Sequence, residues 1–352
     1  TSGAASNEDG AIIGTSFVLS DKGDVANAGE AVNAMNNSKG SFVFAKDNDV
    51  LYIDMDGDST LNTDDYAFTL TGLDSFHGAD IDVTVTGDET DATTITTLDG
   101  NDIITTGAGN DTITSGAGAD IIVAGAGDNT ITSGAGADSI TVAGSGADGA
   151  GNIIDAGSGN DTVVMGTGAG DDTVTLGTGD DTLDARLTTT STEKVLVTDF
   201  EDAGVTVGDT VILAQSLTTK NATGTPTIET IAVTEITSNG DYELATALTL
   251  DTNAVDIVVL TDLDGTHNLT TDFTAESGAQ LYLALATSGA VTTINVDNSG
   301  DEFYILAYSG GEAFLYHADS DGNAEIAATE IKPLIHFDSQ VGTFVADDFS
   351  LV

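Results

Sequence analysis

The sequence has no cysteine and no tryptophan, two prolines, and seven lysines and arginines among 352 residues. Without cysteine, disulfides cannot stabilise the fold. The 58 aspartates and glutamates bring the formal net charge to −51. A chain so poor in basic groups offers no surface for phosphates, so we expect no nucleic-acid binding, and anionic lipid should repel it. No apolar run reaches the roughly 18 residues of a membrane-spanning helix, so we expect no membrane insertion.

The apolar residues, by contrast, are plentiful. They make up 40% of the chain, and most are valine, isoleucine and leucine set among threonines, which is the composition of β-strands. We therefore predict an all-β fold. The acidic side chains repel one another in a compact state. With so few basic residues, a divalent cation is the obvious group to neutralise them.

A nine-residue repeat occupies residues 97–185. Glycines at fixed offsets precede an aspartate or asparagine, and a large aliphatic residue follows two positions later. The repeated acidic or amide residues are Asp102, Asp111, Asp120, Asn129 and Asp138, then, after an interruption at 143–151, Asp161, Asp172 and Asp181. The first aliphatic residues are Ile104, Ile113, Ile122, Ile131 and Ile140. Self-similarity at a fixed period indicates a solenoid.

Each unit is predicted to form a glycine-rich turn and a short strand whose middle aliphatic residue points inward. Two units complete one coil, and stacked coils lie about 4.8 Å apart. Carbonyl and carboxylate oxygens of successive turns then converge. Ca²⁺ prefers such a set, because it takes about 6–8 oxygen ligands.

The repeat resembles the RTX family of calcium-binding nonapeptide proteins, over roughly a quarter of the chain and about eight units. This resemblance implies a parallel β-roll with several calcium ions. It assigns Asp102, Asp120 and Asp138 to one side, Asp111 with Asn129 to the other, and Asp161 with Asp181, together with Asp172, to a later set. The first glycine of the unit is replaced, for example at Thr106 and Ser115, and Asn129 lacks a carboxylate. A metal-free solenoid with aspartates as turn formers is the alternative.

Two further loops resemble EF-hand or dockerin calcium loops, with oxygen-bearing side chains at most of the ligand positions. The ligands that this resemblance implies in the first loop are Asp54, Asp56, Asp58, Thr60, Asn62 and Asp65. Those of the second loop are Asp319, Asp321, Asn323, Glu325 and Glu330. Strand-like segments flank both loops, so hairpin loops without an ion are the alternative.

We expect three parts: a β module at 1–91, the RTX roll at 92–185 and a second β module at 186–352. The segments 195–200 and 208–213 resemble the region that follows the repeats in RTX proteins. The final residues 348–352 resemble the acidic and hydrophobic ending of substrates of type I secretion. The alternative for this ending is an ordinary last strand. The resemblance implies export through a C-terminal signal, which fits the absence of a signal peptide at the start of the sequence.

No catalytic motif is present: there is no zinc-protease helix, nucleophile elbow or phosphate loop. His317 and His336 fall in predicted strands and are expected to be packed or surface residues rather than ligands. We expect a non-enzymatic, secreted, calcium-binding structural protein at the bacterial surface. It would associate with itself into a homopolymer or lattice, as an S-layer, filament or matrix.

Two alternatives remain. Threonine ranks such as Thr112, Thr114, Thr130 and Thr132 suit an adhesin that binds ice or a cell-surface glycan, although β propensity alone explains threonines in strands. The chain could also be the non-catalytic C-terminal part of a secreted RTX enzyme.

Overall fold

The fold is described from a computed structural model. The described residues are 12–14, 16–18, 20–25, 41–45, 50–54, 66–69, 84–87, 92–144, 150–168, 170–185, 194–201, 208–213, 228–232, 247–250, 257–261, 281, 293–296, 302–309, 312–319, 325–338, 344 and 348–351. Their elements are β-strands and a three-residue 3-10 helix, which confirms the predicted all-β class. Among these residues, no helix has the length and hydrophobicity needed to cross a membrane.

The chain forms two compact units. The first comprises Thr1–Ala143 with Asn152–Thr162, and the second comprises Gly144–Gly151 with Val163–Val352. The interruption of the repeat predicted at 143–151 therefore lies at the division between them.

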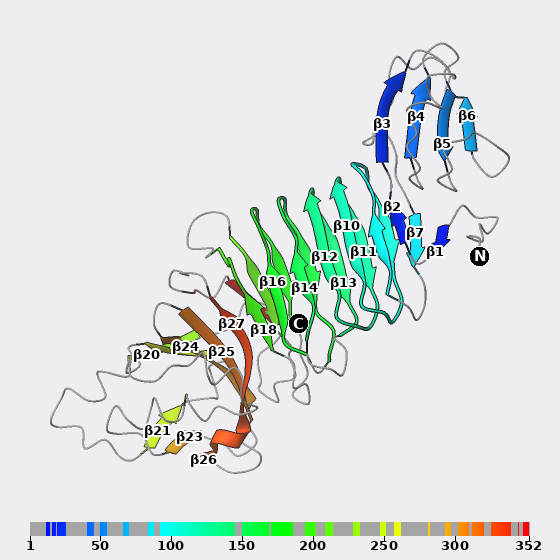
Figure 1. Ribbon diagram of the computed structural model, residues 1–352. Helices are drawn as coiled ribbons and strands as arrows, with labels where there is room; N and C mark the ends of the chain where they lie inside the picture. Colours follow the sequence, from blue (N-terminus) through cyan, green and yellow to red (C-terminus); the bar gives the residue numbers. More distant parts are fainter. Residues whose placement is uncertain are drawn as a thin grey trace. The chain divides into compact units, whose positions relative to one another are not determined.

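Two parallel sheets form the solenoid of the first unit (Figure 1). One sheet contains, in order, β1 (Ile12–Gly14), β7 (Thr84–Gly87), β9 (Ile103–Thr105), β11 (Ile121–Ala124) and β13 (Ser139–Val142). The other contains β2 (Ser16–Val18), β8 (Thr94–Thr96), β10 (Thr112–Ala117), β12 (Thr130–Ala135) and β14 (Ile153–Asp155). Successive repeats alternate between the sheets, so two repeats make one coil and the predicted β-roll is confirmed.

The register of the sheets repeats every coil. Ile113 pairs with Ile95 and Ile131, while Ile122 pairs with Ile104 and Ile140. All six side chains are at most 1% exposed. The inward aliphatic column that the period predicts is therefore real, and each sheet supplies its own column. Burial of one such isoleucine stabilises the fold by about 1.5–3 kcal/mol.

Glycines close the turns where coils approach most tightly. Gly118 has a φ of +135° and Gly136 a φ of +149°, which is the left-handed region that favours glycine. A Cβ atom on Gly118 would overlap the carbonyl oxygen of Gly100 in the preceding coil, and one on Gly136 would overlap that of Gly118. The glycine periodicity of the sequence thus follows from stacking as well as from turn geometry.

The first unit also contains an upstream four-stranded sheet. Its strands are β3 (Ser20–Val25), β4 (Ser41–Ala45), β5 (Val50–Asp54) and β6 (Tyr66–Thr69). β3 and β4 are parallel, whereas β4, β5 and β6 are antiparallel neighbours. These strands belong to the β module expected at 1–91.

The second unit contains both parallel and antiparallel strands. One sheet runs through β15 (Thr162–Val164), β17 (Thr182–Asp184), β19 (Thr210–Leu213) and β28 (Phe349–Leu351). Another runs through β16 (Asp172–Thr175), β18 (Val195–Val197), β27 (Ile331–Phe337), β25 (Glu312–Asp319), β24 (Glu302–Ser309), β22 (Ile257–Thr261) and β20 (Ile228–Ala232). A third sheet contains β21 (Ala247–Leu250), β23 (Thr293–Val296) and β26 (Glu325–Ile326). The 3-10 helix is η3 (Ala328–Glu330).

Aromatic residues build the core of this second unit. The Phe344 ring lies 4.8 Å from that of Phe337, 5.1 Å from that of Phe200 and 5.3 Å from that of Phe349, between ring centroids. Phe349 belongs to β28, which pairs in parallel with β19. The segment predicted as a secretion-like ending is therefore a packed strand of this unit.

Candidate calcium site

The turn before each repeat strand ends in the aspartate or asparagine of the repeat. Strands of one sheet place these residues along one edge of the solenoid, and strands of the other sheet place them along the opposite edge. We call the first set the aspartate edge; it comprises Asp102, Asp120, Asp138 and Asp161. We call the second set the asparagine edge; it comprises Asp111, Asn129 and Asn152. Each of these side chains is at most 2% exposed.

Hydrogen bonds run along the aspartate edge from coil to coil. The backbone N–H of Asp102 donates to Oδ1 of Asp120 at 2.8 Å, that of Asp120 to Oδ1 of Asp138 at 2.8 Å, and that of Asp138 to Oδ1 of Asp161 at 2.8 Å. One carboxylate oxygen of each acceptor therefore fixes the turn of the preceding coil. The second oxygen of each acceptor carboxylate is buried.

The second carboxylate oxygen, Oδ2, is buried without a hydrogen-bond partner at Asp120 and Asp138 of the aspartate edge and at Asp111 of the asparagine edge. A buried, unsatisfied acceptor costs about 1–3 kcal/mol, and more when it is charged. Burial raises the pKa of Asp138 above its usual range; the hydrogen bond from the Asp120 N–H lowers it, and the nearby Asp120 carboxylate raises it further. These oxygens fit a hard divalent cation, which would supply the missing partner and the missing charge.

Asn129 shows the opposite arrangement. Its Oδ1 accepts the N–H of Asp111 at 3.0 Å, as an aspartate would. Its Nδ2 donates to the carbonyl oxygens of Gly125 and Gly127 at 3.2 and 3.4 Å. The side-chain amide of Asn129 is thus the hydrogen-bond donor to these two carbonyl oxygens of its own turn. A turn that ends in asparagine is complete without an ion, whereas a turn that ends in Asp120 leaves an acceptor unsatisfied.

The repeat continues at two positions, Asn152 and Asp209, that were not predicted as ligands. Asn152 accepts the N–H of Asn129 through Oδ1 at 3.0 Å. Asp209 accepts the N–H of Asp181 at 3.1 Å and that of Glu201 at 2.7 Å. Burial, together with the charges of Asp181 and Asp199, raises the pKa of Asp209 to about 7 against the two hydrogen bonds. The sequence does signal both, because an aliphatic residue follows each two positions later.

The predicted calcium ligands of the repeat therefore lie where the nine-residue period expects them. Asp102, Asp120 and Asp138 share one edge, and Asp111 shares the other with Asn129. Asp172 begins β16 and Asp181 directly precedes β17 of the second unit, and both residues are buried.

Replacement of the first glycine in the repeat also has a structural reason. Ser115 and Ser133 occupy this position and are fully buried. The Ser115 hydroxyl donates to the carbonyl of Ser133 at 2.9 Å, and the Ser133 hydroxyl donates to that of Ala156 at 2.8 Å. Small inward side chains at this position therefore link the coils.

The two EF-hand-like loops are described in part. Asp54 ends β5, Asp319 ends β25, Glu325 begins β26 and Glu330 ends η3. Oε2 of Glu330 accepts the backbone N–H of Ala327 at 2.6 Å. The other predicted ligands, Asp56, Asp58, Thr60, Asn62, Asp65, Asp321 and Asn323, lie outside the described residues. Calcium in these two loops stays a prediction.

Comparison with known proteins agrees with the geometry of the repeat. A family model described as the RTX calcium-binding nonapeptide repeat, in four copies, matches residues 90–122, 114–149 and 167–187. No curated protein matches the chain, and no solved structure does. The matched residues include the buried aspartates whose second oxygens lack protein partners. The chain is therefore an RTX-repeat calcium-binding protein that binds Ca²⁺ at several sites.

Proposed function

We propose that the chain is a secreted structural protein of a bacterial extracellular assembly, such as an S-layer, a filament or a matrix, and that calcium switches its folding and assembly. The proposal has no catalytic role for the chain, since its sequence lacks catalytic motifs. The observation that carries it is the unsatisfied buried oxygen of Asp111, Asp120 and Asp138. These groups oppose folding until a cation binds them.

The charge balance supports coupling between folding and export. At a net charge of −51, the chain repels itself when calcium is scarce, as in a cytosol. In millimolar calcium, ions that bind only the folded form stabilise it by about 2.7 kcal/mol for each site held at 100 times its Kd. Export before folding is consistent with this behaviour, as is the resemblance of residues 348–352 to a type I secretion ending.

An exposed apolar patch supports association between copies. Ile103, Ile121 and Val123 are 43%, 47% and 40% exposed. Ile121 pairs with Ile103 in the parallel sheet, so the two side chains are neighbours on its outer surface. A second copy that covers this patch would bury apolar area and gain about 25 cal/mol for each square ångström removed from water.

A calcium titration tests the proposal. The chain, stripped with EGTA, would be titrated to 10 mM CaCl₂ while circular dichroism and light scattering are recorded, with MgCl₂ as the ionic control. We expect β signal and large assemblies to appear together near millimolar calcium. A β signal with monomers throughout would contradict assembly, and no response to calcium would contradict the whole proposal.

Two variants separate assembly from folding. Ile121→Thr removes apolar area from the patch and should keep the calcium-induced β signal while scattering falls. Ile153→Thr is the matched control, because Ile153 is 56% exposed on β14 of the other sheet. Equal loss of scattering in both variants would exclude the patch as the specific contact.

A second candidate function rests on the outer face of β8, β10 and β12. Thr94, Thr112 and Thr130 lie in register on three successive strands, all exposed. Thr96, Thr114 and Thr132 form a parallel rank. The grid repeats at about 4.8 Å across strands and about 6.7 Å along them. Such a grid suits a ligand with its own lattice, such as ice or a crystalline glycan.

Thermal hysteresis in calcium identifies ice binding, and cosedimentation with insoluble polysaccharide identifies glycan binding. Thr112→Tyr should abolish either activity because it interrupts both the spacing and the flatness of the grid. Ser139→Tyr places the same bulk on the other sheet and should have no effect. Absence of both activities in the parent protein would exclude this second function.

A further inference from the structure

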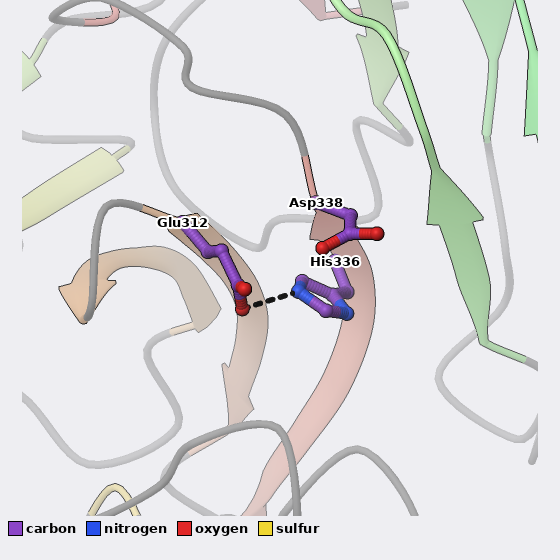
Figure 2. Close-up of side chains that lie close together, drawn as sticks. All are labelled: Glu312, His336 and Asp338. Carbon is purple, nitrogen blue, oxygen red and sulfur yellow. Dashed lines mark hydrogen bonds and ion pairs between the residues drawn. The ribbon is translucent and has the colours of Figure 1, made fainter.

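A group of metal-ligating side chains lies in the second unit, outside the repeat. Glu312 begins β25, His336 lies near the end of β27, and Asp338 follows that strand. These strands are antiparallel neighbours, with Ala313 opposite Phe337 and Phe314 opposite His336. Glu312 is therefore opposite Asp338 in the register of the two strands. His336 and Asp338 are two residues apart, so their side chains lie on the same face of the sheet. Figure 2 shows the three side chains gathered on one side of the two strands.

The ligand atoms are close enough to share one ion. One nitrogen of His336 and one carboxylate oxygen each from Glu312 and Asp338 lie within 4.8 Å of one another. His336 Nε2 lies 2.9 Å from Oε2 of Glu312. Two atoms bound to the same zinc ion at about 2.0–2.2 Å lie roughly 3–3.5 Å apart, so small side-chain adjustments suffice.

Packing holds the imidazole in place. The His336 ring stacks on that of Phe314, with centroids 4.4 Å apart and an angle of 14° between the planes. Phe314 is fully buried, whereas the side chain of His336 is 12% exposed and that of Glu312 is 27% exposed. One side of the group is thus fixed by the core, and the exposed Asp338 leaves the other side accessible to an ion from solution.

We propose that Glu312, His336 and Asp338 form a binding site for one zinc ion, chemically separate from the calcium sites of the repeat. Imidazole nitrogen is a good ligand for zinc, whereas calcium takes oxygen ligands. Two carboxylates and one neutral imidazole balance the charge of a divalent ion. Three protein ligands leave the fourth tetrahedral position to water or to a donor from another molecule.

The alternative is a histidine–glutamate ion pair with no metal. An ion pair needs a protonated imidazole, whereas a metal site needs a neutral one. The ion pair also gives Asp338 no role, while the metal site uses all three side chains.

Zinc binding to the full chain, saturated with 10 mM calcium, tests the site. Isothermal titration with ZnCl₂ should show one ion that His336→Gln removes and that Glu312→Gln weakens at least tenfold. His77→Gln is the matched control and should bind like the parent. Because calcium is saturating and zinc alone is measured, the result is independent of the proposed assembly. Zinc binding that is absent, or that His336→Gln leaves unchanged, would overturn the proposal.

Two further measurements guard against a folding defect. The calcium midpoint of His336→Gln should equal that of the parent protein. In the parent itself, zinc should shift the imidazole ¹⁵N resonance of His336 while that of His317, a buried residue in contact with Tyr304, stays unchanged. An unshifted His336 resonance at saturating zinc would overturn the proposal even if the variants fail to fold.

Discussion

Replacement of Asp120 by asparagine should change stability in opposite directions with and without calcium. Oδ1 of Asp120 accepts the N–H of Asp102, and its Oδ2 is buried without a partner. Asn129, at the equivalent point of the other edge, keeps the first bond and uses its Nδ2 to satisfy two glycine carbonyls. Asparagine at position 120 should adopt the same arrangement.

The expected magnitudes follow from these contacts. In EGTA, the substitution removes one buried, charged and unsatisfied acceptor, so the free energy of unfolding should rise by about 1–3 kcal/mol. In calcium, it removes an oxygen ligand. Loss of one site otherwise held at 100 times its Kd lowers the free energy of unfolding by about 2.7 kcal/mol. At roughly 2–4 °C per kcal/mol, both changes give shifts of several degrees in Tm.

Thermal unfolding of parent and variant, in 1 mM EGTA and in 10 mM CaCl₂, measures both changes. The calcium stoichiometry from isothermal titration should fall in the variant. Asp155→Asn is the control, because Asp155 is exposed at the end of β14 and belongs to neither edge. A variant with lower Tm in both buffers would refute the reasoning, since it would show that the Asp120 carboxylate stabilises the metal-free turn.

The remaining predictions use the same two edges and the core. Asn129→Asp should lower Tm in EGTA and add calcium binding, which isothermal titration would detect. Gly118→Ala should prevent the calcium-induced β signal in circular dichroism, because a Cβ would overlap the carbonyl of Gly100. Ile131→Ala should lower the free energy of unfolding in calcium by about 2–5 kcal/mol, measured by urea titration. In EGTA, protonation of Asp209, whose pKa is raised to about 7, stabilises the fold. This contribution is complete below about pH 4 and is lost as pH rises through 7. Asp209→Asn should therefore flatten this part of the plot of Tm against pH, whereas an unchanged plot would exclude Asp209 as the source.

The repeat region was predictable because its period fixes its geometry. Nine residues return the chain to an equivalent position on the opposite sheet, so one aspartate and one aliphatic residue per unit locate both the turn and the core. The inward position of Ile113 and the edge position of Asp120 follow directly from this count. The period also predicted the two edges, although the insertion places Asn152 off the nine-residue spacing and it was not predicted as a ligand.

The second unit was less predictable because its contacts are distant in sequence. Nothing local in the sequence indicates that β18 pairs with β27, more than a hundred residues later. The same holds for Glu312 and His336, which are 24 residues apart and come together through the pairing of β25 with β27. Asp199 is a further case: its carboxylate accepts the N–H groups of Leu176 and Gly177, both at 2.8 Å, and no spacing rule indicates this.

The difference between a turn that ends in aspartate and one that ends in asparagine gives a physical reason to expect that the stability of the solenoid depends on calcium. Both edges share the same N–H to Oδ1 ladder, so both specify the same register between coils. Individual turns differ in the atom beside that oxygen: an amide nitrogen that donates to two carbonyls at Asn129, and an unsatisfied carboxylate oxygen at Asp120 and Asp111. We therefore expect calcium to act on the stability of the turns that end in aspartate, Asp111 on the asparagine edge included, without having to set the pairing. It follows that successive aspartate-to-asparagine changes along the aspartate edge should lower the calcium requirement stepwise while the β-roll keeps its register.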